Sequence, residues 1–306
     1  MRIAAMAAGA VGGYFGARMA AAGHEVFFIA RGAHLAAMRK NGLKIESVHG
    51  DLHLPKPNVT DDPAEVGPVD IVLFAVKLWD TEKAAELARP LAGPDTRVIT
   101  LQNGVDSVER VAPILGADRV FGGVAYIATV IAAPGVIKHT SQFAMLRFAR
   151  ADGRADPALQ AFVDAGKAAK LDIDLSKNIE VERWQKFIFL TAMAGSTASK
   201  RSPIGPITAT EEGRKLFRSL MEEAQAVGKA QGVAVPPDYI DQRMDFLLSK
   251  IEPGMKASMA HDLERGNRLE LDWLNGKVAS LGKELGVPTP ASDQVYATLK
   301  PHRMGK

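Results

Sequence analysis

Residues 1–31 of this chain read MRIAAMAAGAVGGYFGARMAAAGHEVFFIAR. The stretch predicts a β-strand over 2–6, a glycine-containing turn, a helix that continues through Met19, and a second strand over 25–29. In a dinucleotide-binding βαβ unit, the second glycine of GxGxxG lets the backbone approach a pyrophosphate, and the third lets the helix pack closely on the strand. Gly9 and Gly12 occupy these positions, so the stretch predicts a Rossmann-like, nucleotide-binding fold.

The turn departs from the full motif at one position. Ala7 stands where the first glycine would ease the tight turn, and alanine can serve there only if its φ stays negative. A glycine-rich turn without a ligand is the alternative interpretation. We expect a phosphate-binding turn that comprises Ala7, Ala8, Gly9, Ala10, Val11 and Gly12.

The end of the second predicted strand bears on the choice of cofactor. NAD sites usually place Asp or Glu there to bind the ribose 2′-hydroxyl, but this chain has Arg31 and no acid. A guanidinium group can pair bidentately with a 2′-phosphate. The sequence therefore favours NADPH/NADP over NAD, with a merely solvated Arg31 as the alternative.

The first 23 residues also resemble a secretory signal, because Arg2 precedes an apolar stretch that ends in Ala20–Ala22. That stretch consists mostly of Ala and Gly, and Arg18 interrupts it. We therefore expect a cytoplasmic protein. No other apolar run approaches the 18 or more residues of a membrane span, so we expect no membrane partner.

Composition excludes several classes of protein. The chain has 306 residues, 47% of them hydrophobic and 24% charged, and 38 basic against 35 acidic side chains leave a net charge of +3. These values are typical of a globular protein with two domains and argue against nucleic acid as a partner. Cysteine is absent and the seven histidines show no paired ligand spacing, so we expect no metal site. The oligomeric state stays open, and a homodimer is one alternative.

Two patterns divide the chain. Up to about residue 176, short β-rich runs alternate with helical ones, which predicts a doubly wound α/β sheet. Beyond the first two strands, the expected strands cover 42–47, 70–77, 97–103, 120–131, 135–140, 143–149 and 171–176. From Ile179 onward only long helical patterns follow, over 179–200, 208–232, 237–251, 258–286 and 291–302. We therefore predict an α/β plus all-α protein, with a Rossmann-like NADP-binding domain over 1–176 and an all-helical substrate and catalytic domain over 177–306.

Three polar residues of the helical half have two interpretations each. Lys186 stands at the start of a helical segment that is apolar all round, so it is either partly desolvated and able to release a proton near neutral pH, or extended to water. Ser258 is either a helix N-cap or a hydroxyl that binds a substrate carboxylate. Glu270 is either an amphipathic border residue or the partner of a buried cation.

Seven short motifs follow one another along nearly the whole chain. They are GAVG at 9–12, Arg31, VKLWD with Lys77, LQNGV with Asn103, ERWQK with Lys186, SMAHDL with Ser258, and LELDWLNG with Glu270. In this order they resemble the 2-dehydropantoate 2-reductase (ketopantoate reductase) family. The resemblance implies an NADPH-dependent reductase of a small 2-oxo acid, with its active site in the cleft between the two domains.

The resemblance also implies roles for individual residues. Lys186 would be the general acid that protonates the ketone oxygen, and Glu270 would lie near the cofactor ribose and the substrate. Asn103 would contact both nicotinamide and substrate, and Ser258 would bind the substrate. The cofactor would further be bound at three positions, which are Arg31, Lys77 and the backbone of Ala128.

The family frequently has asparagine at three positions where this chain has apolar residues. These residues are Leu190, Ala194 and Ile204. Losing amides that would bind a hydroxylated acid should change which substrates are accepted. The leading hypothesis is reduction of 2-dehydropantoate to pantoate in pantothenate biosynthesis. The alternatives are an NADPH-dependent reductase of a more apolar 2-oxo acid in the same family, and a non-catalytic NADPH-binding sensor.

Overall fold

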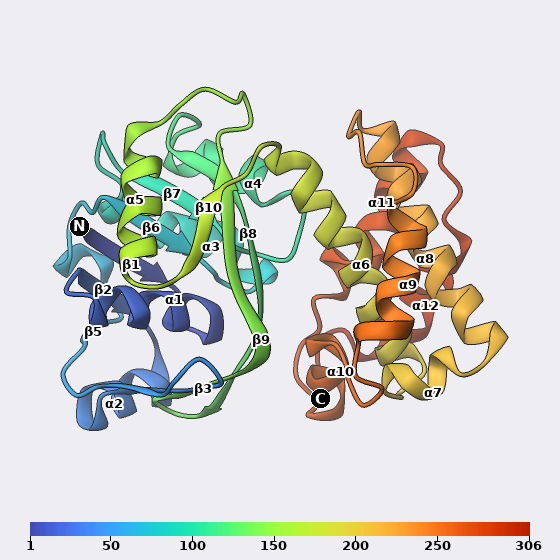
Figure 1. The fold of residues 1–306 in the computed structure, drawn as a ribbon, viewed down its shortest axis with the longest axis horizontal. Helices are drawn as coiled ribbons and strands as arrows, with labels where there is room; N and C mark the ends of the chain where they lie inside the picture. The colour runs from blue at the N-terminus through green and yellow to red at the C-terminus, as the bar shows by residue number, and fades with distance from the viewer. The chain divides into compact units, whose positions relative to one another are not determined.

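The computed structural model describes every residue from Met1 to Lys306. The chain forms two compact units. The sheet unit comprises residues 1–102 and 106–179, and the helical unit comprises residues 103–105 and 180–306. Figure 1 follows the chain from the sheet unit, drawn in blue to green, into the helical unit, drawn mainly in yellow to red.

The elements follow the expected change from mixed to purely helical structure. Those of the sheet unit are β1 (Arg2–Met6), α1 (Ala10–Ala21), β2 (Glu25–Ile29), α2 (Gly32–Asn41), β3 (Leu43–Ser47), β4 (Leu52–Leu54), β5 (Asn58–Thr60), β6 (Ile71–Phe74), α3 (Thr81–Leu87), β7 (Arg97–Thr100), α4 (Ser107–Leu115), β8 (Val120–Ala133), β9 (Val136–Ala149), α5 (Pro157–Ala168) and β10 (Asp172–Leu175). Those that follow are α6 (Ile179–Ser199), α7 (Ile204–Thr208), α8 (Glu211–Ala230), α9 (Tyr239–Lys250), α10 (Ser258–Glu264), α11 (Asn275–Leu285) and α12 (Pro290–Leu299).

The sheet contains a block of six parallel strands in the order β5-β2-β1-β6-β7-β8. Strands β2 and β5 follow on one side of β1, and strands β6, β7 and β8 follow on its other side. The order therefore reverses between β1 and β6, which is where open α/β sheets bind ligands beyond the carboxyl ends of the strands. Beyond β8, the sheet continues with antiparallel β9 and then β3 and β4, and β10 also pairs with β9.

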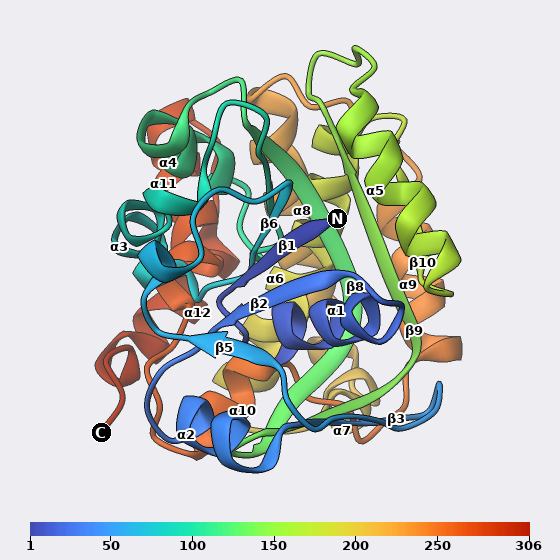
Figure 2. The same ribbon diagram turned by 90° about the vertical axis from the view of Figure 1, so that its left-hand side faces the viewer.

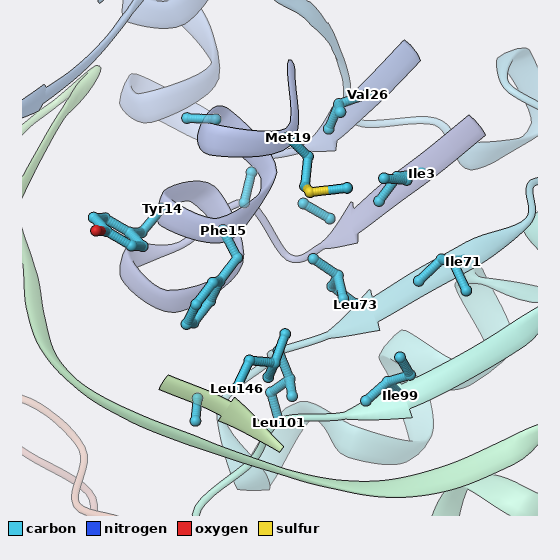
Figure 3. Close-up of a cluster of buried hydrophobic side chains, with 14 of the residues drawn as sticks. Ile3, Tyr14, Phe15, Met19, Val26, Ile71, Leu73, Ile99, Leu101 and Leu146 are labelled. Atoms are coloured by element: carbon cyan, nitrogen blue, oxygen red, sulfur yellow. The ribbon is translucent and has the colours of Figure 1, made fainter. Parts of the chain in front are cut away.

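Helices cover both faces of this sheet, as the predicted doubly wound arrangement requires. In Figure 2, α1 and α5 lie on one side of the strands and α3 and α4 on the other. Figure 3 shows Phe15 and Met19 of α1 pointing toward Ile3 and Leu73 of the neighbouring strands. These four side chains are fully buried in one apolar cluster, and the strand residues that alternate with Ile3 and Leu73 are buried in a second cluster. The strands therefore have both faces covered.

Two details of the sheet unit differ from the sequence expectations. The runs 135–140 and 143–149, expected as separate strands, belong to the single strand β9, which pairs along its length with β8. Strands β4 and β5 were not expected at all. Each has only three residues, too few for an alternating pattern to be recognised in the sequence.

The helical unit contains no strand, but its predicted helix 258–286 is wrong as one element. Helix α10 ends at Glu264, because Gly266 adopts a left-handed φ of +68° and the N–H of Asn267 bonds back to the carbonyl of Asp262 at 2.8 Å. An irregular segment and a short 3₁₀ turn over Leu271–Trp273 follow, and α11 then begins. Glu270 therefore lies between two helices rather than on the face of a long one. The short helix α7 was also not expected.

The core of the helical unit is built around α6 and α8. Seven apolar side chains of this core come from α6, and they are Trp184, Phe187, Ile188, Ala192, Met193, Ala194 and Ala198. The expectation that this helix is buried on every face is met over residues 191–198, whereas Phe189 and Leu190, closer to Lys186, are half-buried. No helix of the chain combines the length and the apolar character that a membrane span needs.

Candidate active site

Three candidate segments of the sheet unit follow three neighbouring strands whose ends are in register. Met6, the last residue of β1, pairs with Ile29 on one side and with Phe74 on the other. The glycine turn, Arg31 and Lys77 come one to three residues after these strand ends. The fold thus brings the expected cofactor-binding segments together at the point where the strand order reverses.

The two glycines of the turn have the properties expected of them, which are open space for a ligand at Gly9 and close packing of the helix at Gly12. Gly9 is the N-cap of α1 with extended backbone, and a Cβ placed on it would meet no atom within 4 Å, which leaves room for a ligand. A Cβ on Gly12 would overlap the carbonyl oxygen of Ala7, so close packing of the helix requires glycine there. The first N–H groups of α1 lack intrahelical partners and no acid lies in the first turn, which suits an anion.

Ala7 meets the condition set for it, since Lys170 and Arg201 are the only non-glycine residues with positive φ. The turn is also supported by a residue that the sequence did not reveal, His34 of α2. Its Nδ1 accepts from the N–H of Gly135 at 3.0 Å, so its Nε2 carries the proton and donates to the carbonyl of Ala8 at 3.1 Å. Burial lowers the pKa of His34, which keeps this neutral tautomer in place.

Arg31 and Lys77 lie at the same edge of the sheet, with exposed side chains. Arg31 is the N-cap residue of α2, and its side chain makes no hydrogen bond or ion pair within the protein. The Nζ atom of Lys77 lies 5.5 Å from the ring centre of Trp79, a cation–π contact that leaves it near the surface. Both cations are therefore accessible to an anionic ligand.

Gln102, which the sequence analysis did not single out, connects the loops that follow β6 and β7. Its Nε2 donates to the carbonyl of Val76 at 3.1 Å and to Oγ1 of Thr81 at 2.8 Å. Because Gln102 and Thr81 are both buried, these bonds hold the Lys77 loop in place. The available signal was an amide side chain near the end of an otherwise apolar predicted strand.

Ala128 lies at an irregularity in the pairing of β8 with β9, between Ile127 and Thr129. Its N–H donates to Oγ of Ser141 at 2.9 Å, and its carbonyl accepts from Oγ1 of Thr140 at 3.4 Å. The backbone donor expected to contact the cofactor thus already has a partner inside the sheet unit. The role of Ala128 stays a prediction.

In the helical unit, three of the expected residues form one polar cluster. The Nζ atom of Lys186 donates to Oδ1 of Asn103 at 2.8 Å. Glu270, only 6% exposed, interacts electrostatically with the same ammonium group. The structure thus favours the interpretation of Glu270 as the partner of a cation, and that cation, Lys186, is half-buried.

The environment of Lys186 changes its acidity. Burial lowers its pKa to about 8, and the negative charge of Glu270 partly opposes that shift by favouring the ammonium form. A lysine with a pKa close to neutral can exist as an ammonium and still release its proton readily. The side chain of Asn103 makes no other hydrogen bond in the protein, so its amide N–H groups are available to a ligand.

Ser258 does not cap α10. The N-cap residue is Ala257, no side chain caps the helix, and Ser258 is the exposed first residue. The N–H of Ala257 donates to Oγ1 of Thr197 at 3.3 Å, which fixes the start of α10 to α6. The cap interpretation is therefore wrong, and the Ser258 hydroxyl is available for another partner.

The three apolar residues at the family's asparagine positions are not surface side chains. Ala194 and Ile204 are buried and Leu190 is half-buried. Leu190 and Ala194 follow Lys186 at intervals of four on α6, which places all three on one side of the helix. The N–H of Ile204 donates to the carbonyl of Met255 at 2.9 Å, which joins the loop after α6 to the loop before α10.

A third residue that sequence reasoning missed is Arg183, one turn before Lys186 on α6. Its Nη2 donates to the carbonyl of Val105 at 2.6 Å, and its Nη1 pairs with Glu180 at 2.8 Å. An arginine in an otherwise ordinary ERWQK helix segment carries no local sign of such a contact.

Both units of the chain match known proteins. Residues 3–151 match the family described as "Ketopantoate reductase PanE/ApbA", and residues 178–303 match "Ketopantoate reductase PanE/ApbA C terminal". The chain is 33% identical to a 2-dehydropantoate 2-reductase of Mesorhizobium japonicum, over 98% of this chain and 97% of that one. It is 29% identical, over the full length of both, to an uncharacterized oxidoreductase, YkpB, of Bacillus subtilis.

Solved structures agree on the fold. A PanE/ApbA family ketopantoate reductase from Ralstonia eutropha superposes with a TM-score of 0.90 at 33% identity, covering 99% of this chain and 98% of the other. A D-mandelate dehydrogenase, solved with NADH and anilino(oxo)acetate, also reaches a TM-score of 0.90 over 99% and 98% of the two chains. Its identity is only 21%, so that likeness concerns the fold alone.

Proposed function

Because this chain belongs to the ketopantoate reductase PanE/ApbA family and is an oxidoreductase, we propose that it reduces 2-dehydropantoate to pantoate with NADPH. The observation that carries the proposal is the cluster of Lys186, Asn103 and Glu270 in the helical unit. It combines a proton donor of suitable acidity, an amide with free donors and a carboxylate. The reaction would be a step of pantothenate biosynthesis.

The residues of the sheet unit fit a dinucleotide. The open space at Gly9 and the free N–H groups at the start of α1 suit a pyrophosphate, and Arg31 has no partner that would compete with a 2′-phosphate. Lys77 adds a second accessible cation. When bound, NADPH supplies the hydride that reduces the ketone carbon.

Lys186 would hold the proton that the reaction consumes. Its Nζ atom donates that proton to the ketone oxygen as negative charge develops there, and the oxygen becomes the hydroxyl of the product. Burial makes the ammonium more acidic, while Glu270 keeps it protonated near neutral pH. Asn103 orients Nζ through its amide oxygen and offers its N–H groups to the substrate or the nicotinamide.

Four residues bear on the identity of the substrate. Ser258 has an exposed hydroxyl that can bind a carboxylate or a hydroxyl group. Leu190, Ala194 and Ile204, in contrast, provide no hydrogen bonds from their side chains, which favours a second candidate, a reductase of a more apolar 2-oxo acid. The likeness in fold to a mandelate dehydrogenase is compatible with either candidate.

A panel of 2-oxo acids tests the proposal directly. Purified protein is mixed with NADPH and each acid in turn, and cofactor oxidation is followed by absorbance. We expect the highest kcat/KM with 2-dehydropantoate. A kcat/KM at least about tenfold higher for a bulkier apolar acid would support the second candidate instead. Tight NADPH binding without oxidation by any acid would indicate a sensor and overturn both.

A further inference from the structure

Residues 103–105 follow strand β7 in the sequence but belong to the helical unit. We call them the clip segment. Lys186 donates to the side chain of Asn103 at its first residue, and Arg183 donates to the carbonyl of Val105 at its last. The side chain of Val105, 7% exposed, is part of the apolar core that also contains Phe187. The clip segment is thus held at both ends by one helix.

The contact from Arg183 is well defined. Its side chain is 3% exposed, and its Nη2 reaches the carbonyl of Val105 at 2.6 Å, a short charge-assisted hydrogen bond. Its other terminal nitrogen, Nη1, pairs with Glu180, so the two partners are bound by different nitrogens of the guanidinium group. Arg183 and Lys186 are three positions apart, so both bonds to the clip segment come from neighbouring positions on α6.

We propose that Arg183 is a positioning residue, which together with Val105 holds the clip segment so that Asn103 stays in contact with Lys186. The inference rests on the proposed function, in which Lys186 is the proton donor. An ammonium group only donates, so the amide oxygen of Asn103 must face Lys186 and the amide N–H groups must face away. With the Val105 end released, Asn103 would lose this fixed orientation, and the reacting group would be less well placed.

The competing explanation is that Arg183 forms only a stabilising ion pair with Glu180. In that case the loss of Arg183 would affect the folded protein in the same way whether or not Asn103 is present. Non-additivity between the two residues separates the explanations, because residues that act through one another show a coupling in a double-mutant cycle.

The experiment is a cycle of Arg183→Met, Asn103→Ala and the double variant, assayed by NADPH oxidation with the best 2-oxo acid of the panel. We expect Arg183→Met to lower kcat by about 10-fold to 100-fold in the wild-type background. In the Asn103→Ala background we expect a further loss of less than about twofold. Equal losses in both backgrounds would overturn the proposal.

Control variants separate this proposal from the proposed function. Glu180→Gln removes the ion pair but leaves the bond to Val105, and Arg218→Met removes a remote arginine of α8, so we expect both to retain the wild-type kcat. A large loss with Glu180→Gln would overturn the proposal. If Lys186→Ala leaves kcat unchanged, the proposed function fails and the positioning role fails with it. A strong effect of Lys186→Ala with additive Arg183 losses overturns the positioning role alone.

A second variant covers the case in which Arg183→Met does not fold, as judged by thermal unfolding. Val105→Ala loosens the same end of the clip segment without leaving a buried charge. We expect it to show the same dependence on Asn103. A kcat loss that is independent of Asn103, or no loss at all, would overturn the proposal.

Discussion

The Nζ atom of Lys186 lies 2.8 Å from Oδ1 of Asn103, a residue 83 positions earlier in the chain. Asn103 follows the sheet's strand β7, whereas Lys186 lies in the long helix α6. The contact places an amide and an ammonium group side by side, and the carboxylate of Glu270 acts on the same ammonium.

Lys186→Ala should lower kcat by about 100-fold or more, because general acid catalysis contributes roughly 10² to 10⁴. The measurement is steady-state NADPH oxidation with the best 2-oxo acid. Lys200→Ala is the matched control, since Lys200 pairs with Glu212 on the surface. An unchanged kcat in the Lys186 variant would contradict its role as proton donor.

The activity should depend on pH through Lys186. A general acid must be protonated, so kcat/KM should fall as pH rises through about 8, the pKa of Lys186. Glu270 raises that pKa, so Glu270→Gln should move the decline to lower pH. The pH–rate profiles of both proteins test this, with exposed Glu284→Gln as control. A decline that stays in place or moves to higher pH in the Glu270 variant would refute the electrostatic argument.

Arg31→Ala should raise KM for NADPH several-fold and leave KM for NADH nearly unchanged, because only NADPH carries the 2′-phosphate. Arg39→Ala is a suitable control on the same helix, since Arg39 is exposed and makes only a long ion pair of 3.7 Å with Asp61. Initial rates with both cofactors provide the comparison. A wild-type preference for NADH would argue against the NADP assignment.

Gly9→Ala and Gly12→Ala should affect different properties, NADPH binding in the first case and stability in the second. A methyl group at Gly12 overlaps the carbonyl of Ala7, so we expect the free energy of unfolding to fall by about 1–3 kcal/mol. A methyl group at Gly9 meets only open space, so we expect a loss below about 1 kcal/mol but weaker NADPH binding. Urea unfolding and fluorescence titration measure the two quantities. Equal NADPH affinity in wild type and Gly9→Ala would place the pyrophosphate elsewhere.

Leu190→Asn should shift specificity toward hydroxylated 2-oxo acids. Leu190 is one helical turn beyond Lys186 and is half-buried, so an amide there adds donors on the same side of α6. We expect the ratio of kcat/KM for 2-dehydropantoate to that for an apolar 2-oxo acid to rise by at least about tenfold. Leu248→Asn, at an exposed position of α9, should leave the ratio unchanged. An unchanged ratio in the Leu190 variant would remove this residue from the specificity site.

Local patterns in the sequence determined most of the secondary structure and the glycine turn. The strand, turn and helix at residues 2–21 could be predicted because the turn depends on Gly9 and Gly12, whose effects act within a few residues. The change from sheet to helices near Ile179 was equally visible. Local patterns were insufficient where elements were very short, as in β4, or where a single left-handed glycine, Gly266, divided a helical run.

The polar cluster, in contrast, was decided by the tertiary structure. The residues alone left Lys186 and Glu270 with two interpretations each, because neither burial nor distant charges can be read from neighbouring positions. Packing of α6 in the helical core lowers the pKa of Lys186, and the fold brings Asn103 and Glu270 to it from segments far away in the chain. Local sequence can thus identify candidate residues. The acidity of a lysine, in contrast, depends on the atoms that surround it in three dimensions.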